Sequence, residues 1–121
     1  MSTFKYFNVS TANVTELAAI EAIGSTSPYG VIQNEIIVGP PSYITMCNKD
    51  ASGDECVVEL YLENTSATPA TIHILHDTII PSGATLILEE PELKYDTTVY
   101  ALKFKLTSVA ATQLVDIKVE Y

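Results

Sequence analysis

Two histidines, His73 and His76, are the first candidates for chemistry in this sequence. They lie three residues apart in the segment TIHILHD, a spacing that would place both on one face of a helix. The β-branched residues around them favour a strand, in which successive side chains point to opposite faces. We therefore expect His73 and His76 to lie on opposite sides of a sheet, with Leu75 and Asp77 on the side of His73. That arrangement would not let the two imidazoles share a metal.

A second group of candidate ligands and nucleophiles lies between Cys47 and Cys56, in the segment CNKDASGDEC. Its alternating oxygen side chains resemble a calcium loop, but the twelfth position counted from Asp50 is Tyr61, where such a loop has a glutamate. The other interpretation is a hairpin, because Asp50 and Gly53 suit the first and fourth positions of a type I turn. A four-residue loop would place Cys47 opposite Cys56. The two cysteines would then form a disulfide or, as we favour for a reducing cytoplasm, stay free thiols.

No other pattern in the sequence indicates catalysis. There is no glycine-rich phosphate loop, no nucleophile elbow and no zinc motif. Adjacent carboxylates such as Glu89 and Glu90 would face opposite sides of a strand. We predict that the protein is not an enzyme and has no catalytic residue, no cofactor and no metal site.

The elements that position these residues are strands, because apolar and polar side chains alternate over most of the chain. We expect strands near 4–10, 30–38, 42–48, 55–63, 70–77, 84–90, 97–107 and 113–121. The side chains that we expect to face the core in the clearest of them are Cys56, Val58, Leu60 and Leu62; Tyr100, Leu102, Phe104 and Leu106; and Val115, Ile117, Val119 and Tyr121. The segment 15–23 fits a short helix that begins at Thr15 and ends before Gly24, and it fits a strand equally well.

Short strands at regular intervals, separated by turn residues, predict an all-β protein. We expect residues 1–121 to form a single antiparallel β-sandwich of about eight strands, with either a jelly-roll or an immunoglobulin-like topology. Residues 1–30 would form part of this domain, or an arm or short helix followed by a loop.

The composition excludes several classes of partner. The 121 residues include 15 acidic residues and six lysines, with no arginine, for a net charge of −9. Such a protein repels nucleic acid and anionic membranes. The first residues have no secretory pattern and no apolar run reaches the ~18–20 residues that span a membrane, so we expect synthesis in a cytoplasm.

The middle and C-terminal thirds resemble small β-sandwich structural proteins of tailed phages, especially marine and cyanobacterial ones. The resemblance covers about residues 42–121 and rests on Asn48, on the run VELY at 58–61, on IPSGATLIL at 80–88 and on the closing VDIKVEY. It implies a virion structural protein, foremost a capsid decoration or cement subunit, and otherwise a neck or tail component. Free or tail-associated glycan binding is a further alternative, weakened by the absence of tryptophan.

A subunit of this kind would be made in the host cytoplasm and would end in the virion. Its partners would be other virion proteins, such as the major capsid protein or neck and tail proteins, and copies of itself. Exposed tyrosines suit such contacts, and we expect Tyr61 and Tyr95 to lie at the interface.

Overall fold

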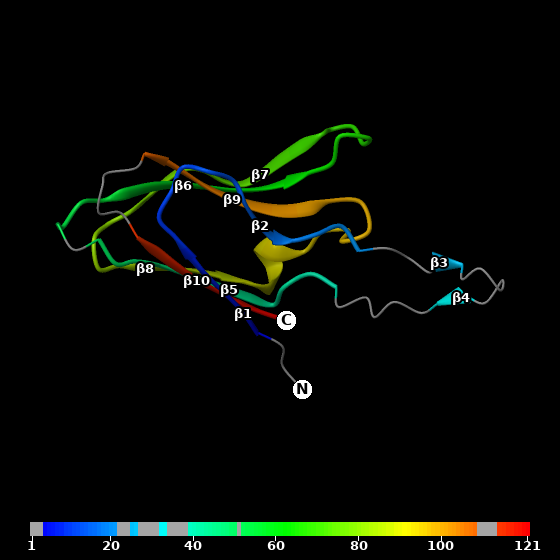
Figure 1. Cartoon of the computed structure of the whole chain (residues 1–121), viewed down its shortest axis with the longest axis horizontal. Helices are drawn as coiled ribbons and strands as arrows, with labels where there is room; N and C mark the ends of the chain where they lie inside the picture. Colours follow the sequence, from blue (N-terminus) through cyan, green and yellow to red (C-terminus); the bar gives the residue numbers. More distant parts are fainter. Residues whose placement is uncertain (1–3, 22–24, 27–31, 34–38, 51, 109–113) are drawn as a thin grey trace.

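The computed structural model describes residues 4–21, 25–26, 32–33, 39–50, 52–108 and 114–121. These residues form ten strands and one short 3₁₀ helix (Figure 1). The elements are β1 (Phe4–Val9), β2 (Thr15–Ala18), β3 (Ser25–Thr26), β4 (Ile32–Gln33), β5 (Tyr43–Asn48), β6 (Cys56–Glu63), β7 (Thr71–Ile80), β8 (Thr85–Glu89), η1 (Glu90–Leu93), β9 (Ala101–Ser108) and β10 (Val115–Glu120). No helix in this described part of the chain is long and apolar enough to cross a membrane.

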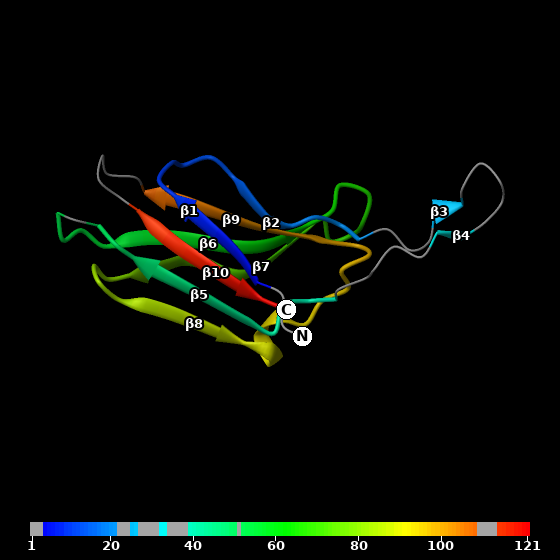
Figure 2. The same cartoon turned by 60° about the horizontal axis from the view of Figure 1, so that its bottom comes forward.

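Eight of the strands build two antiparallel sheets that lie face to face, as Figures 1 and 2 show from two sides. The first, which we call the β1 sheet, has the order β1-β10-β5-β8. The second, the β2 sheet, has the order β2-β9-β6-β7. Strands β3 and β4 form a separate two-stranded sheet. The edges of the sandwich are therefore β1, β8, β2 and β7.

The strands pair in a nested pattern: β1 with β10, β2 with β9, β5 with β8, and β6 with β7. The first half of the sandwich thus runs antiparallel to the second half, like one long hairpin folded over into two layers. This order is that of a jelly roll, and it confirms the predicted all-β sandwich. An immunoglobulin-like sandwich would place the first two strands in one sheet, whereas β1 and β2 lie in different sheets here.

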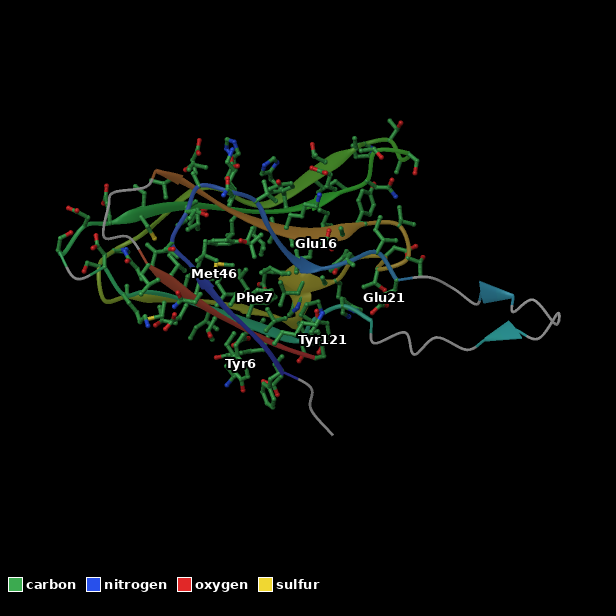
Figure 3. All side chains as sticks on the ribbon, in the orientation of Figure 1. Tyr6, Phe7, Glu16, Glu21, Met46 and Tyr121 are labelled. Atoms are coloured by element: carbon green, nitrogen blue, oxygen red, sulfur yellow. The ribbon has the colours of Figure 1, made fainter. Side chains whose placement is uncertain are left out.

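The core lies between the sheets and follows the predicted alternation closely. Met46 lies between the two layers (Figure 3). The buried side chains of the three alternating segments are Cys56, Val58, Leu60, Leu62, Leu102, Phe104, Leu106, Val115, Ile117 and Val119. Tyr100 and Tyr121 are half-buried and pack against this core. Ala101 alternates with the core residues Tyr100 and Leu102 and so belongs to the outer face, yet it is buried, because its small side chain lies on a strand that is flanked on both sides, by β2 and β6.

The strand expected near 84–90 is present as β8, and it lies at an edge of the β1 sheet. Leu88 is buried and Leu86 is half-buried against the core. The acidic residues that follow are exposed, and they continue as the 3₁₀ helix η1, whose Leu93 is fully buried.

In two segments the structure differs from the expected strands or describes only part of one, and in a third it decides between the helix and strand alternatives. Residues 15–18 form strand β2, which pairs with β9, so the helix alternative is wrong for this part; residues 22–24 lie outside the described residues. Strand β9 begins at Ala101 and not at 97, because Asp96 organises a turn: its side chain accepts a hydrogen bond from the Thr98 amide, and its carbonyl accepts one from the Tyr100 amide. Of the strand expected near 30–38, only β4 is described.

Candidate functional site

The outer face of the β2 sheet carries a group of three metal-ligating side chains, Glu59, His73 and His76. Glu59 lies on β6, and the two histidines lie on the neighbouring edge strand β7. One ligand atom from each side chain lies within 4.8 Å of the others. Within the described residues, no other group of three histidine, cysteine, aspartate or glutamate side chains meets this criterion.

Two irregularities in the pairing of β7 with β6 bring the histidines together. Leu60 pairs with Leu75 and Tyr61 with His73, so Ile74 is an extra residue on β7. Val58 pairs with Thr78, so that two residues of β7, His76 and Asp77, lie opposite the single β6 residue Glu59. Extra residues of this kind are β-bulges, which re-aim side chains. They turn His76 to the same outer face as His73.

The backbone of Asp77, within the second bulge, has a left-handed conformation. Its φ is 49°, and it is the one described residue other than glycine with a positive φ. Aspartate tolerates this conformation better than most residues do. The sequence therefore supplies a suitable residue at the position where the strand must bend.

The distances within the group suit a bound cation. The Nε2 atoms of His76 and His73 lie 3.3 Å and 3.9 Å from the same atom, Oε1 of Glu59. The other ring nitrogen of His76, Nδ1, lies 3.6 Å from Oδ2 of Asp77. The two imidazole rings meet edge to face, with their centroids 4.9 Å apart.

The prediction that His73 and His76 point to opposite sides of the sheet is therefore wrong. It assumed an unbroken alternation along 71–78, and the bulge at Ile74 shifts that alternation by one residue. Asp77 consequently pairs with His76 and not with His73.

Charged residues on β6 and β9 surround this group on the outer face. Lys105 lies opposite Glu59 on β9, and Lys103 lies opposite Tyr61. Lys103 donates a hydrogen bond of 2.9 Å to Glu63, and this bond raises the pKa of the lysine. Glu63 is therefore already paired with a lysine, whereas Glu59 forms ion pairs with the two histidines.

Tyr61 lies on this outer face as expected, but it is not exposed. Its ring lies 5.2 Å from the His73 ring, and only 8% of the residue is accessible to solvent. Burial, followed by the nearby Glu63 charge, raises the pKa of its hydroxyl. Tyr61 was expected to be exposed at an interface, but the His73 ring packs on it and it is largely buried.

The loop between β5 and β6 is organised by hydrogen bonds of Asn48 and Asp50. The amide nitrogen of buried Asn48 donates to the carbonyls of Asp54 and Ile80, at 3.0 and 2.9 Å, and its oxygen accepts from the Asp50 amide at 3.0 Å. The Asp50 carboxylate in turn accepts hydrogen bonds from the amides of Ser52 and Asp54, both at 3.1 Å. The Asp50 carboxylate thus accepts hydrogen bonds from the loop itself, as in a turn.

The turn predicted at 50–53 is present, but the hairpin is not. The Gly53 amide donates to the Asp50 carbonyl, as in a β-turn. However, β5 belongs to the β1 sheet and β6 to the β2 sheet, so the loop crosses between the layers. Cys47 lies opposite Asp116 and Thr85, Cys56 lies opposite Ile80, and both are free thiols. The register that placed Cys47 opposite Cys56 is wrong, because sequence spacing alone does not distinguish a hairpin from a crossover.

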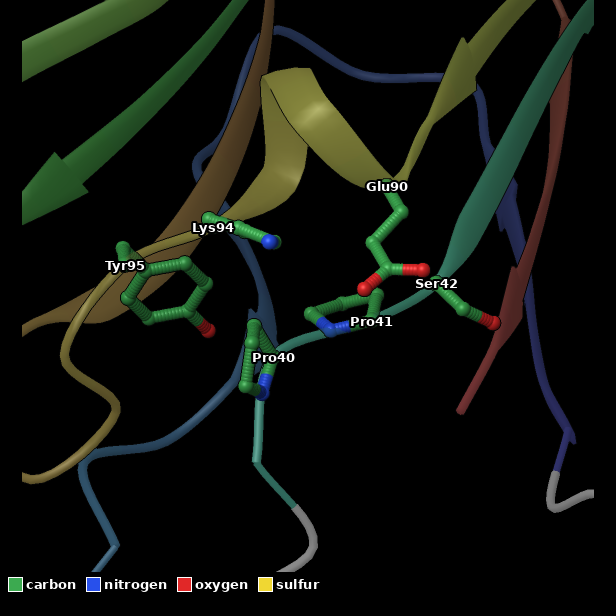
Figure 4. Close-up of a pocket in the computed structure, with 6 residues that line it drawn as sticks. All are labelled: Pro40, Pro41, Ser42, Glu90, Lys94 and Tyr95. Carbon is green, nitrogen blue, oxygen red and sulfur yellow. The ribbon is translucent and has the colours of Figure 1, made fainter.

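Tyr95, the other expected interface residue, is half-buried at a surface hollow of about 620 Å³. Its hydroxyl is directed toward Pro40, and Glu90 extends across Pro41 on the opposite wall (Figure 4). Burial, with smaller contributions from Tyr121 and Glu21, raises the pKa of Tyr95 well above its usual range.

Among the described phenylalanines and tyrosines, the most exposed lie elsewhere, on edge strand β1. Tyr6 is 71% exposed, and it stacks on Phe4 with centroids 6.4 Å apart. Tyr6 points away from the core on the outer side of the β1 sheet (Figure 3). The ammonium of Lys118 lies 5.0 Å from the centre of the Phe4 ring. The sequence contains the signal for this pair, since Phe4 and Tyr6 alternate with Lys5 on a predicted strand.

Beside this pair lies a second hollow, of about 370 Å³, on the outer side of the β1 sheet. Its lining includes Tyr6 and the polar side chains of Asn8, Asp116 and Lys118. Asn8 donates a 2.7 Å hydrogen bond to Asp116, which is also paired with Lys49 at 2.8 Å. The hydrogen bond to Lys49 is the main reason that the pKa of Asp116 is lowered.

Comparison with known protein families, with curated proteins and with solved structures found no match to this chain.

Proposed function

We propose that this protein is a structural subunit of a phage virion, most specifically a capsid decoration subunit that binds the assembled particle through protein–protein contacts. The observation that carries the proposal is the exposed aromatic pair Phe4 and Tyr6 on an open edge of a jelly-roll sandwich. Jelly rolls are common in viral capsid proteins, although a fold alone does not determine a function. The resemblance of residues 42–121 to phage sandwich proteins supports the same class.

The chemistry of strand β1 suits a docking surface. Its partner in the described sheet is β10 on one side, so its other side presents unpaired backbone groups to a neighbouring chain. Tyrosine and phenylalanine are enriched at protein interfaces, where they supply a large contact area with few rotatable bonds. A partner strand added along β1 would lie beside these rings.

Binding to purified particles tests the proposal. The protein should form defined oligomers, or cosediment with the capsids of the phage that encodes it. Cosedimentation with isolated tails would instead support the neck or tail alternative. Tyr6→Ser should weaken the interaction, whereas Ile79→Ser, which alters an exposed side chain on the other sheet, should not. A monomer that binds neither heads nor tails would contradict the proposal.

Glycan binding is a second candidate, favoured by the same aromatic pair and the polar hollow beside it. Sugar rings pack on exposed aromatic faces, while their hydroxyls bond to groups such as Asn8 and Asp116. A glycan array probed with the wild-type protein should then give hits that Tyr6→Ser loses. An array without hits would remove this candidate.

A further inference from the structure

We infer that Glu59, His73 and His76 form a binding site for a divalent transition metal, with zinc as the best fit. The site ties edge strand β7 to β6 on the outer face of the β2 sheet. The inference does not depend on the proposed virion role, because a different sheet carries the aromatic pair.

The ligand types select the class of metal. Two imidazoles and one carboxylate suit zinc and related ions, whereas calcium and magnesium prefer oxygen ligands. Three protein ligands leave a position for water in a tetrahedral zinc site. All three side chains reach solvent, with Glu59 at 17%, His73 at 37% and His76 at 62% side-chain exposure, so an ion can enter.

The two distances to Glu59 are close to those of zinc coordination. Ligands at the usual zinc bond lengths lie about 3.3–3.5 Å from one another in a tetrahedral site. The Glu59–His76 separation of 3.3 Å already has this value, and the Glu59–His73 separation of 3.9 Å is slightly longer. Because both histidines lie on the exposed face of an edge strand, a small rotation of His73 would close the difference.

A second observation supports a metal over a simple ion pair. Histidines that bind a metal usually direct their other ring nitrogen at a carboxylate, which orients the ring. His76 is close to this arrangement: Glu59 lies 3.3 Å from Nε2, and the Asp77 carboxylate lies 3.6 Å from Nδ1, just beyond hydrogen-bond length. The residue that supplies the outer carboxylate is also the one whose φ of 49° forms the bulge. Backbone conformations of this type are concentrated at functional sites.

Calorimetric titration of the tag-free protein with zinc chloride tests the site. We expect one zinc ion to bind per chain. Glu59→Gln and His76→Asn should each weaken zinc binding at least about tenfold. Loss of a residue that only orients a metal ligand already costs about 10- to 100-fold in metal affinity, and these two residues are proposed as ligands. The matched control is Glu63→Gln, which removes a carboxylate of the same face that pairs with Lys103; its zinc affinity should stay within twofold of wild type.

Cys47→Ser removes the partly exposed thiol, which lies on the opposite sheet, and should leave zinc binding unchanged. Nuclear magnetic resonance of the wild-type protein supplies a readout that needs no variant. The chain contains two histidines, and both imidazole signals should shift together at one equivalent of zinc. Absence of a one-to-one complex, unchanged imidazole signals, or equal zinc affinities of Glu59→Gln and wild type would each overturn the inference.

Discussion

Replacing Asn48 with alanine would remove three side-chain hydrogen bonds that hold the β5–β6 loop against the start of the β7–β8 turn. Asn48 is fully buried, and it bonds to the carbonyls of Asp54 and Ile80 and to the Asp50 amide. Its own backbone carbonyl also accepts a hydrogen bond from the Gly83 amide. The Asn48 side chain therefore links the β5–β6 loop to the turn between β7 and β8.

The expected loss follows from these contacts. A typical intramolecular hydrogen bond contributes about 1 kcal/mol net, so three bonds give about 3 kcal/mol. The loss of unfolding free energy should not be smaller than this, because the buried partners of Asn48 would be left unsatisfied, and an unsatisfied buried polar group is itself costly. A domain has only about 5–15 kcal/mol of unfolding free energy, so this one side chain would account for a large fraction of it. The melting temperature should fall by about 10 °C.

Urea denaturation of Asn48→Ala and of a control, Asn8→Ala, measures the difference. Asn8 also donates one side-chain hydrogen bond, but it is exposed, so its removal should cost less than about 1 kcal/mol. Asn48→Asp should be at least as damaging as the alanine variant, because a carboxylate oxygen would then face two carbonyl oxygens. If Asn48→Ala and Asn8→Ala have the same free energy of unfolding, the network around Asn48 does not secure the loop and the reasoning fails.

Three further outcomes follow from the described geometry. In the native protein a thiol reagent should label Cys47 and spare Cys56, because Cys56 is buried and burial raises its pKa; Ellman titration should count a second thiol only after unfolding. Asp116→Asn should flatten the loss of stability at acid pH. The lowered pKa of Asp116 stabilises the folded state at pH values above the unfolded pKa of about 3.9, and this contribution is lost as the pH falls through the folded pKa. If the urea midpoint falls equally steeply with pH in the variant and in wild type between about pH 5 and 2, the prediction is wrong. Gly83→Ala should cost about 1–2 kcal/mol in unfolding free energy, since its φ is +76° while nothing lies within 4 Å of the added Cβ; a neutral result in thermal denaturation would show that the turn adjusts.

The core was predictable because it depends on a local signal. Side chains of period two, such as Leu102, Phe104 and Leu106, identify the buried face of a strand wherever that strand lies in the sheet. The order of the strands was not predictable, because it depends on pairings between distant segments such as β1 and β10. Spacing alone thus left the jelly-roll and immunoglobulin-like topologies equally open.

The candidate metal site was missed for a related reason. Its assembly depends on an extra residue at Ile74 and on the backbone conformation of Asp77, and neither changes the composition of the segment. The β-branched residues around His73 identified the strand correctly. The side chains of that strand do not alternate regularly between the two faces, however, because β7 contains bulges. The exposure of Tyr61 failed similarly, because the same displacement places the His73 ring over it.

The nested pairing also determines when the chain can fold during synthesis. β1 has β10 as its partner in the described sheet, so β1 cannot pair until the whole chain between these two strands has been synthesised. By contrast, β6 and β7 are neighbours in sequence and can pair as soon as both have emerged. Folding that depends on such distant contacts is slow, and the nascent chain would expose the aromatic β1 segment until β10 emerges. The same strand that we propose for docking is thus the one most open to premature association with other nascent chains.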